Sequence, residues 1–229
     1  MNEYSSKFRA LLRDVYSCNI CPSSYGFKYS PNGSYFKFPP LIGRTSSVDL
    51  LFVGINPRRT YSNSDLHTTL MSSKVAFANL ASNKSEGHSY VSRGSAELHY
   101  RFHVGLVERI YGKSKPFESV AAVTELFLCA SARANTLPNS GSPCADRFFS
   151  RTLEIAQPKV IIALGRKVLG YFKTKPHKPV EPDEILIQTR GSEFPVISIC
   201  HPANPAISEI EKEALITDIA RRIRRWINV

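Results

Sequence analysis

The chain has 229 residues, of which 42% are hydrophobic and 21% are charged, and its formal net charge at pH 7 is +11. Such a chain can bury a sizeable core, so we expect one soluble globular domain over residues 1–229. No apolar run reaches membrane-spanning length and the first residues lack a secretory signal, which predicts a cytoplasmic protein with no membrane partner. The positive charge indicates nucleic acid as the simplest partner, although a solvated basic surface would also account for it.

The predicted elements alternate between helix and strand along the chain. In order, they are a helix over 5–17, a loop over 22–47, a buried strand over 48–53, helices over 70–80 and 97–111, a strand over 120–128, a helix over 144–157, a strand over 159–164, a helix over 168–172, a proline-rich loop over 173–184, a strand over 194–200 and a helix over 206–227. This order predicts an α/β fold. We expect a three-layer α/β/α sandwich around a central, mostly parallel sheet of four to five strands.

The first strand ends at the string Gly54-Ile55-Asn56-Pro57. Glycine permits a sharp turn or the close approach of a ligand, and proline ends sheet pairing. Asn56 therefore offers a carboxamide at the carboxyl end of a buried strand, which is where open α/β sheets bind ligands. The alternative is that Asn56 only caps the turn.

A second polar string, His201-Pro202-Ala203-Asn204-Pro205, follows the last predicted strand. In a parallel sheet both strings lie at one edge, so a carboxamide and an imidazole are expected to converge on one small ligand. A third strand ends in Gly165-Arg166-Lys167 and enters a helix, and this helix start beside two cations predicts a phosphate contact. The last helix ends in further cations that suit its C-terminus and offer phosphate contacts, namely Arg221, Arg222, Arg224 and Arg225.

Five cysteines in a chain without an export signal do not predict a disulfide framework. They are interpreted either as buried apolar residues or as metal ligands. Cys18 and Cys21 form a Cys-x-x-Cys pair, Cys129 directly follows a predicted strand, and Cys144 opens a helix. Cys200 is left as a core residue.

These strings, the order of strands and helices and the basic charge together resemble the uracil-DNA glycosylase superfamily. Gly-Ile-Asn-Pro is similar to the first motif of its mismatch-specific and thymine-DNA branch, and His201-Pro202 is similar to the start of the second motif, whose loop enters the duplex. Residues 158–172 are similar to a helix entry of the iron-sulfur branch, in which four cysteines hold a [4Fe-4S] cluster. The resemblance assigns that cluster to Cys18, Cys21, Cys129 and Cys144. Zinc is the alternative, because it accepts the same four thiolates.

The resemblance implies a monomeric DNA glycosylase that cleaves the N-glycosidic bond of a flipped pyrimidine. Asn56 would position and polarise the water that attacks C1′, and His201 would stabilise the charge on the departing base. The enzyme is expected to be monofunctional, because no lysine lies at either motif to form a Schiff base. Gly54 and Ile55 would line the base pocket, and Tyr61 would stack on the base, with Phe77 in reserve. The residues expected to contact DNA are Arg58, Arg59, Gly165, Arg166, Lys167, Pro202, Asn204 and Pro205.

Two positions depart from the family's pattern. Arg58 stands where the family has glycine, and Glu125 stands where the iron-sulfur branch has an asparagine that reads uracil. An ionised carboxylate only accepts hydrogen bonds, so Glu125 is expected to favour an exocyclic amino group, as on cytosine. Because excising ordinary cytosine would destroy the host genome, the hypothesis is a modified cytosine of phage DNA, with residues 58–118 shaping a larger pocket.

Three alternatives stay open. If Glu125 faces away or is protonated, uracil remains the substrate and the role is DNA repair rather than antiviral defence. A different class of function is a non-catalytic DNA-binding module of the same fold that recognises an altered base without cleaving it. The weakest is a structural zinc protein.

Overall fold

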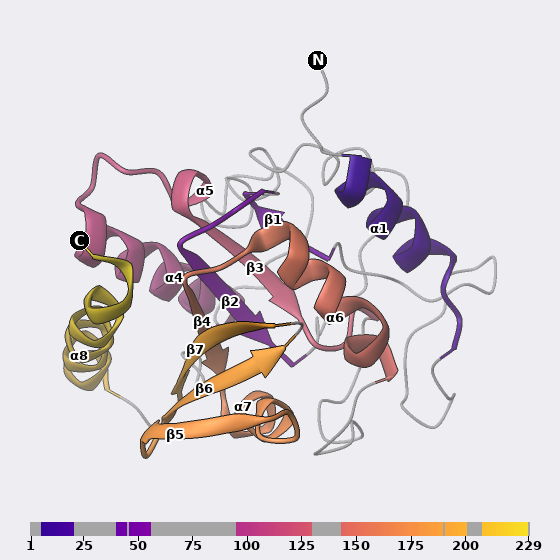
Figure 1. Ribbon diagram of the computed structural model, residues 1–229. Helices are drawn as coiled ribbons and strands as arrows, with labels where there is room; N and C mark the ends of the chain where they lie inside the picture. Colours follow the sequence, from indigo (N-terminus) through magenta and orange to yellow (C-terminus); the bar gives the residue numbers. More distant parts are fainter. Residues whose placement is uncertain are drawn as a thin grey trace.

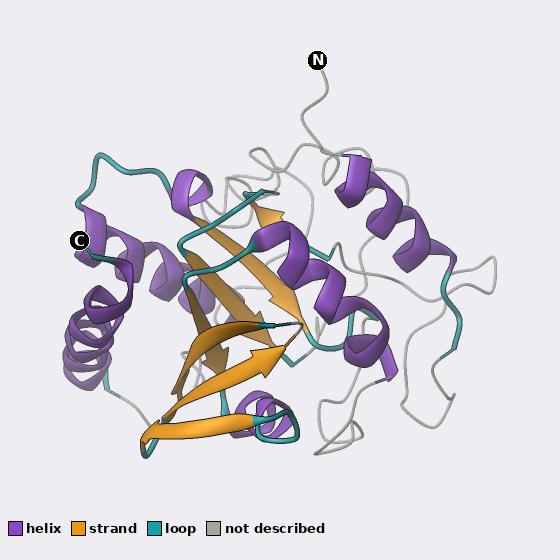
Figure 2. Cartoon of the chain, viewed as in Figure 1, coloured by secondary structure: helices purple, strands orange, loops and turns teal. Residues whose placement is uncertain are grey.

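The structure is a computed structural model that describes residues 6–20, 40–44, 46–55, 95–129, 143–189, 191–200 and 208–228. These residues form an α/β fold in which helices flank a mixed, mostly parallel sheet (Figures 1 and 2). The elements in chain order are α1 (Ser6–Ser17), β1 (Ile42–Gly43), β2 (Leu50–Gly54), α4 (Ser95–Tyr111), α5 (Phe117–Val120), β3 (Ala121–Glu125), α6 (Pro143–Ala156), β4 (Val160–Leu164), α7 (Arg166–Phe172), β5 (His177–Glu181), β6 (Glu184–Thr189), β7 (Ser192–Ile199) and α8 (Glu209–Ile227).

The sheet has the strand order β1-β3-β2-β4-β7-β6-β5. Its centre consists of four parallel strands, since β2 pairs in parallel with β3 and with β4, and β4 pairs in parallel with β7. The strands β6 and β5 extend it as an antiparallel hairpin beside β7. Six strands make up this sheet, and the two-residue β1 adds a short antiparallel seventh at the other edge.

Helices cover both faces of the sheet because successive side chains of each central strand point to opposite sides. On β2, Leu51 and Val53 pack into a core formed with α1, α6 and α7, whereas Leu50 and Phe52 pack into a second core formed with α4, α5 and α8. All five residues of β2 and of β4 are buried. Such burial explains why these strands are continuous apolar runs in the sequence. Each fully buried Leu or Phe side chain stabilises the folded state by roughly 1.5–3 kcal/mol relative to an exposed one.

The sequence predicted the central strands and the helices α1, α4, α6, α7 and α8 to within a few residues. The count of four to five strands is wrong. The segment read as a proline-rich loop contains β5, and β6 follows it. Four of the five β5 residues are exposed and Pro179 lies within the strand, so β5 has no apolar pattern. A proline is tolerated there because β5 is an edge strand.

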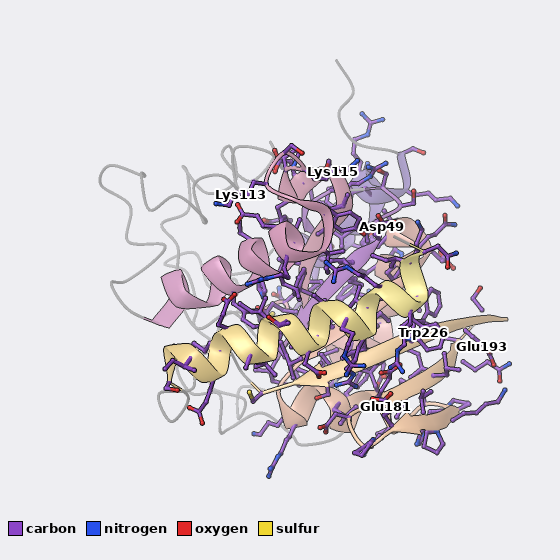
Figure 3. The ribbon with its side chains drawn as sticks, turned by 90° about the vertical axis from the view of Figure 1, so that its left-hand side faces the viewer. Asp49, Lys113, Lys115, Glu181, Glu193 and Trp226 are labelled. Carbon is purple, nitrogen blue, oxygen red and sulfur yellow. The ribbon has the colours of Figure 1, made fainter. Side chains whose placement is uncertain are left out.

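A cluster of charged side chains fastens α8 to the hairpin. Glu184 of β6 is fully buried and accepts hydrogen bonds from Arg222 at 3.1 Å, Arg225 at 2.9 Å and the indole of Trp226 at 2.8 Å. Arg225 also pairs with Glu181 at 2.8 Å. Figure 3 shows Trp226 at the C-terminal end of α8, where the helix lies against the hairpin. The C-terminal part of α8 is thereby fixed to the β5–β6 hairpin.

None of the helices among the described residues combines the length and the apolar character needed to cross a membrane.

Candidate functional site

The carboxyl ends of four parallel strands meet at one edge of the sheet, in the order β3, β2, β4, β7. Figure 2 shows the arrows of β2 and β3 running side by side in the same direction. In open α/β sheets this edge is the usual place for a ligand. The described residues at the edge are Glu125 at the end of β3, Ile55 after β2, Gly165 after β4 and Cys200 after β7.

Backbone hydrogen bonds hold the ends of β2 and β3 together beyond the paired strands. Leu126 N–H donates to the carbonyl of Gly54 at 3.0 Å, and Phe127 N–H donates to the carbonyl of Ile55 at 3.0 Å. Ile55, which directly precedes Asn56, is therefore fixed at the edge. The sequence predicts one strand over residues 120–128, whereas β3 ends at Glu125 and the next two residues form this clamp. The charge of Glu125 within an apolar run is the signal that marks the end of the strand.

A second clamp joins β4 to β7. Gly165 N–H donates to the carbonyl of Ile199 at 2.8 Å, two residues before His201. Gly165 has φ +97°, a conformation that favours glycine. Since its N–H is bound to Ile199, this amide is not free to hold a phosphate as predicted. Arg166 is exposed beside it and remains a candidate for that contact.

These two sets of backbone hydrogen bonds fix the distance between the starts of the two predicted catalytic motifs, which contain Asn56 and His201. Strand β4 lies between β2 and β7, and neighbouring strands are spaced by about 4.8 Å, so the strings start roughly 10 Å apart at the same edge. Asn56 and His201 lie outside the described residues. So do the other predicted site residues Cys21, Arg58, Arg59, Tyr61, Pro202, Asn204 and Pro205.

Glu125 lies on the same edge and faces its neighbour on β2. The two residues Gly54 and Glu125 are paired in register, and a Cβ added at Gly54 would collide with the Glu125 carboxyl group. The Oε2 atom of Glu125 is buried and has no hydrogen-bond partner within the described part of the chain. Burial raises the pKa of Glu125 to about 8. Of the two forms that the sequence leaves open for Glu125, its burial favours the protonated one.

Three of the four predicted cluster cysteines are described. Cys18, Cys129 and Cys144 are buried in the core between the sheet, α1 and α6. Cys144 Sγ accepts a hydrogen bond from Leu128 N–H at 3.3 Å, a contact of the kind that tunes cluster thiolates. Over the described ranges, no group of three or more His, Cys, Asp or Glu side chains could hold a metal ion. Cys18, Cys129 and Cys144 are thus not gathered into a metal site within these ranges, and Cys21 lies outside them.

The arginines of α8 are engaged with protein groups. Arg222 and Arg225 bind Glu184, Arg221 pairs with Asp218 at 2.6 Å, and Arg224 donates to the carbonyl of Arg109. The sequence predicts phosphate contacts for these cations. Arg222, Arg224 and Arg225 instead fasten α8 to the hairpin and to α4, whereas Arg221 pairs within α8 and stays exposed.

No model of a known protein family matches the chain, and no curated protein matches it significantly. Its function is therefore inferred from the chemistry of the site.

Proposed function

We propose that the chain is a monofunctional DNA glycosylase with the three-layer α/β/α architecture of the uracil-DNA glycosylase superfamily. The observation that carries the proposal is the pair of clamps at the carboxyl edge of the sheet. They hold Ile55 directly before Asn56, and Ile199 just before His201, on strands separated only by β4. A carboxamide and an imidazole that start there can reach one sugar–base unit from two sides.

The proposed reaction is hydrolysis of the bond between C1′ and the base nitrogen. Asn56 holds a water for attack on C1′, and the water oxygen forms the new bond to the sugar. The C1′–N bond breaks and its electron pair leaves with the base, where a His201 N–H stabilises the negative charge. The water proton ends on the base after it departs. Flipping the nucleotide out of the duplex costs a few kcal/mol before this step.

The substrate is a pyrimidine, either uracil or a modified cytosine such as a hypermodified base of phage DNA. Glu125, Gly54 and Ile55 line the end of β2 and β3, where the edge of the base would be read. Tyr61 is the proposed stacking residue. Uracil would make the enzyme a DNA-repair protein, and a modified cytosine would indicate antiviral defence.

The DNA partner is supported by the net charge of +11. Arg166 is exposed at the carboxyl edge and Lys167 follows it, so both suit a phosphate near the flipped nucleotide. Arg58 and Arg59 follow the first string, and Pro202, Asn204 and Pro205 belong to the second, whose proposed role is to fill the space that the base vacates. We propose that the protein acts as a monomer.

A [4Fe-4S] cluster on Cys18, Cys21, Cys129 and Cys144 is proposed as a structural group, with zinc as the alternative. Such a centre would tie the end of α1 to the segment after β3 and to the start of α6. It would thereby support the clamp on Ile55 without taking part in the chemistry.

The deciding experiment measures base release from duplexes that contain uracil, a thymine mispair, 5-hydroxymethylcytosine or glucosylated 5-hydroxymethylcytosine, with alkali cleavage of the abasic product. Asn56→Ala and His201→Ala are the matched variants. Release by the wild type that both variants abolish supports the proposal. If wild type and Asn56→Ala are equally inert on every duplex, the non-catalytic DNA-binding module replaces it.

A further inference from the structure

The two helical layers that cover the sheet differ in charge. The layer of α1, α6 and α7, taken over residues 6–17, 143–156 and 166–175, has nine Lys or Arg and three Asp or Glu. The layer of α4, α5 and α8, taken over residues 95–120 and 209–227, also has nine Lys or Arg, but it has seven Asp or Glu. The excess of positive charge on these helices therefore belongs mainly to the first layer.

The helices of the first layer form one continuous surface. Asp14 of α1 pairs with Arg151 of α6 at 2.7 Å. Asp146 in the first turn of α6 pairs with Lys175, just after α7, at 3.0 Å. These pairs occupy two of the three acids of the layer. Its exposed cations that pair with no acid in the described part of the chain are Lys7, Arg13, Arg147, Arg166 and Lys173.

Part of this surface begins at the carboxyl edge of the sheet. Leu128 N–H, three residues beyond β3, donates to Cys144 Sγ at 3.3 Å, so the first turn of α6 is held near that edge together with Arg147. Helix α7 follows β4 directly, with Arg166 as its first residue. Lys173 comes seven residues later and so lies on the same face of the helix as Arg166. These three cations lead from the edge over α7 toward α6.

The other helical layer is acidic where it starts. Helix α8 follows the carboxyl end of β7 through residues 201–207 and lies on the other face of the sheet. Its first two turns contain one cation, Lys212, and the three acids Glu209, Glu211 and Glu213. Duplex DNA carries one negative charge per about 1.7 Å of its axis, so these acids repel it, whereas the cations of α6 and α7 attract it.

Building on the proposed function, we infer that the bound duplex continues over the surface formed by Arg147, Arg166 and Lys173, called here the α6–α7 surface. These cations bind phosphates on one side of the flipped nucleotide, and the duplex leaves the site over α6 and α7 rather than over α8. Contacts to phosphates fix the orientation of a duplex without reading its sequence. The α6–α7 surface thus sets the direction in which the target strand enters the site and plays no part in the choice of base.

The first experiment measures DNA affinity as a function of salt, with a duplex that carries no altered base. Each phosphate contact contributes about 0.9 to the slope of log K against log salt. We expect Arg147→Gln and Lys173→Gln each to lower the slope by about 1, and the double variant to lower it by about 2.

The matched control is the double variant Lys113→Gln, Lys115→Gln. Both lysines are exposed, pair with no acid within the described ranges and lie on the loop after α4 (Figure 3). That loop is at the amino edge of the sheet, because Tyr111 at the end of α4 donates to Asp49, just before β2, at 2.8 Å. The control removes the same charge at the opposite edge, so its slope should equal that of the wild type. An equal fall in both double variants overturns the inference, because it reflects net charge alone.

The second experiment tests the direction of the duplex. The target nucleotide is a 2′-fluorinated deoxyuridine or 5-hydroxymethyldeoxycytidine, in which the fluorine prevents hydrolysis, and the duplex is shortened on one flank or on the other. Shortening one flank should weaken binding by the wild type and leave the double variant Arg147→Gln, Lys173→Gln unchanged. Shortening the other flank should affect both proteins alike. Equal effects of the two flanks on the wild type overturn the inference. So does a double variant that keeps its DNA affinity and loses only binding to phosphatidylserine vesicles, which would make this a membrane surface.

Base release from ordinary duplexes is scored separately. A wild type that shows the expected slopes and releases no base refutes the glycosylase proposal and leaves the DNA surface standing. Base release that Asn56→Ala abolishes, together with equal slopes in all variants, refutes the DNA surface alone.

Discussion

The carboxyl group of Glu125 lies over the backbone of Gly54, so close that a Cβ on residue 54 would come within 2.7 Å of the carboxyl carbon. The contact follows from the parallel pairing of β2 and β3, which puts the two residues in register on one face of the sheet. A glycine and an acid that are far apart in the sequence thus form one unit at the candidate site.

Replacing Gly54 with alanine should disturb this unit. The added methyl group has to displace the Glu125 side chain, and overpacking of this kind costs about 1–3 kcal/mol. We expect urea denaturation to show that loss, together with reduced binding of the pyrimidine duplexes. Gly105→Ala is the control, because a Cβ added at Gly105 would meet only the end of the Ile216 side chain at 3.8 Å, an ordinary contact. Unchanged duplex binding by Gly54→Ala would contradict the role of the pair.

The stability of the protein should depend on pH through Glu125. Its pKa is about 8 in the folded chain and near 4.5 when unfolded, so the folded state binds more protons between these values. The contribution of the neutral acid is fully present below pH 4.5 and is lost as the pH rises toward 8. We expect Glu125→Gln to remove a decline of a few kcal/mol across this range, measured by urea unfolding at several pH values. Parallel curves for the two proteins would contradict this.

Glu184 should matter for stability far more than an exposed acid. Glu184→Ala removes the shortest ion pair of the buried Arg222 and leaves it the longer ones to Glu181 at 3.5 Å and Asp218 at 4.0 Å. Breaking a buried pair costs about 3–5 kcal/mol. The matched control is Glu193→Ala, which removes an exposed pair with Lys178 and should cost less than about 1 kcal/mol. Thermal and urea unfolding measure both. Figure 3 shows Glu193 at the margin of the sheet, away from α8. Equal losses would mean that Glu184 is not a buried fastening point.

The proposed cluster predicts that the purified protein binds iron and is brown. Cys18→Ser, Cys129→Ser and Cys144→Ser should each lose the colour and most of the iron, measured by visible absorption and elemental analysis. Cys200→Ser is the control, since Cys200 lies outside the predicted set and is exposed, so the core position expected for it from the sequence is wrong. A colourless wild type with one bound zinc would select the alternative metal.

Arg166 should contribute to DNA binding through charge alone. Arg166→Ala is expected to weaken binding equally for all duplex sequences and to lower the slope of log K against log salt by about 1. Arg221→Ala provides the comparison, because Arg221 is equally a surface arginine but pairs with Asp218 on α8. If the two variants have the same slope, the phosphate contact is not at Arg166.

The sequence predicts best where burial dictates the residue type. Continuous apolar runs identified β2 and β4, and apolar residues at helical spacing identified α1, in which Phe8, Leu11, Leu12 and Val15 are buried. It failed at β5, where exposure on both faces leaves no periodic signal. The sequence left the protonation of Glu125 open, because a pKa depends on the desolvation that folding produces.

The segment 201–207 joins two parts of the fold that are each held in place independently. One is Ile199, held by Gly165, and the other is α8, which begins at the Ser208 capping box and is fastened by Glu184. The distance that residues 201–207 have to bridge is therefore set by the positions of Ile199 and Ser208. An engineered library built on this segment should therefore keep its length and the proposed catalytic His201, because the scaffold holds both points of attachment.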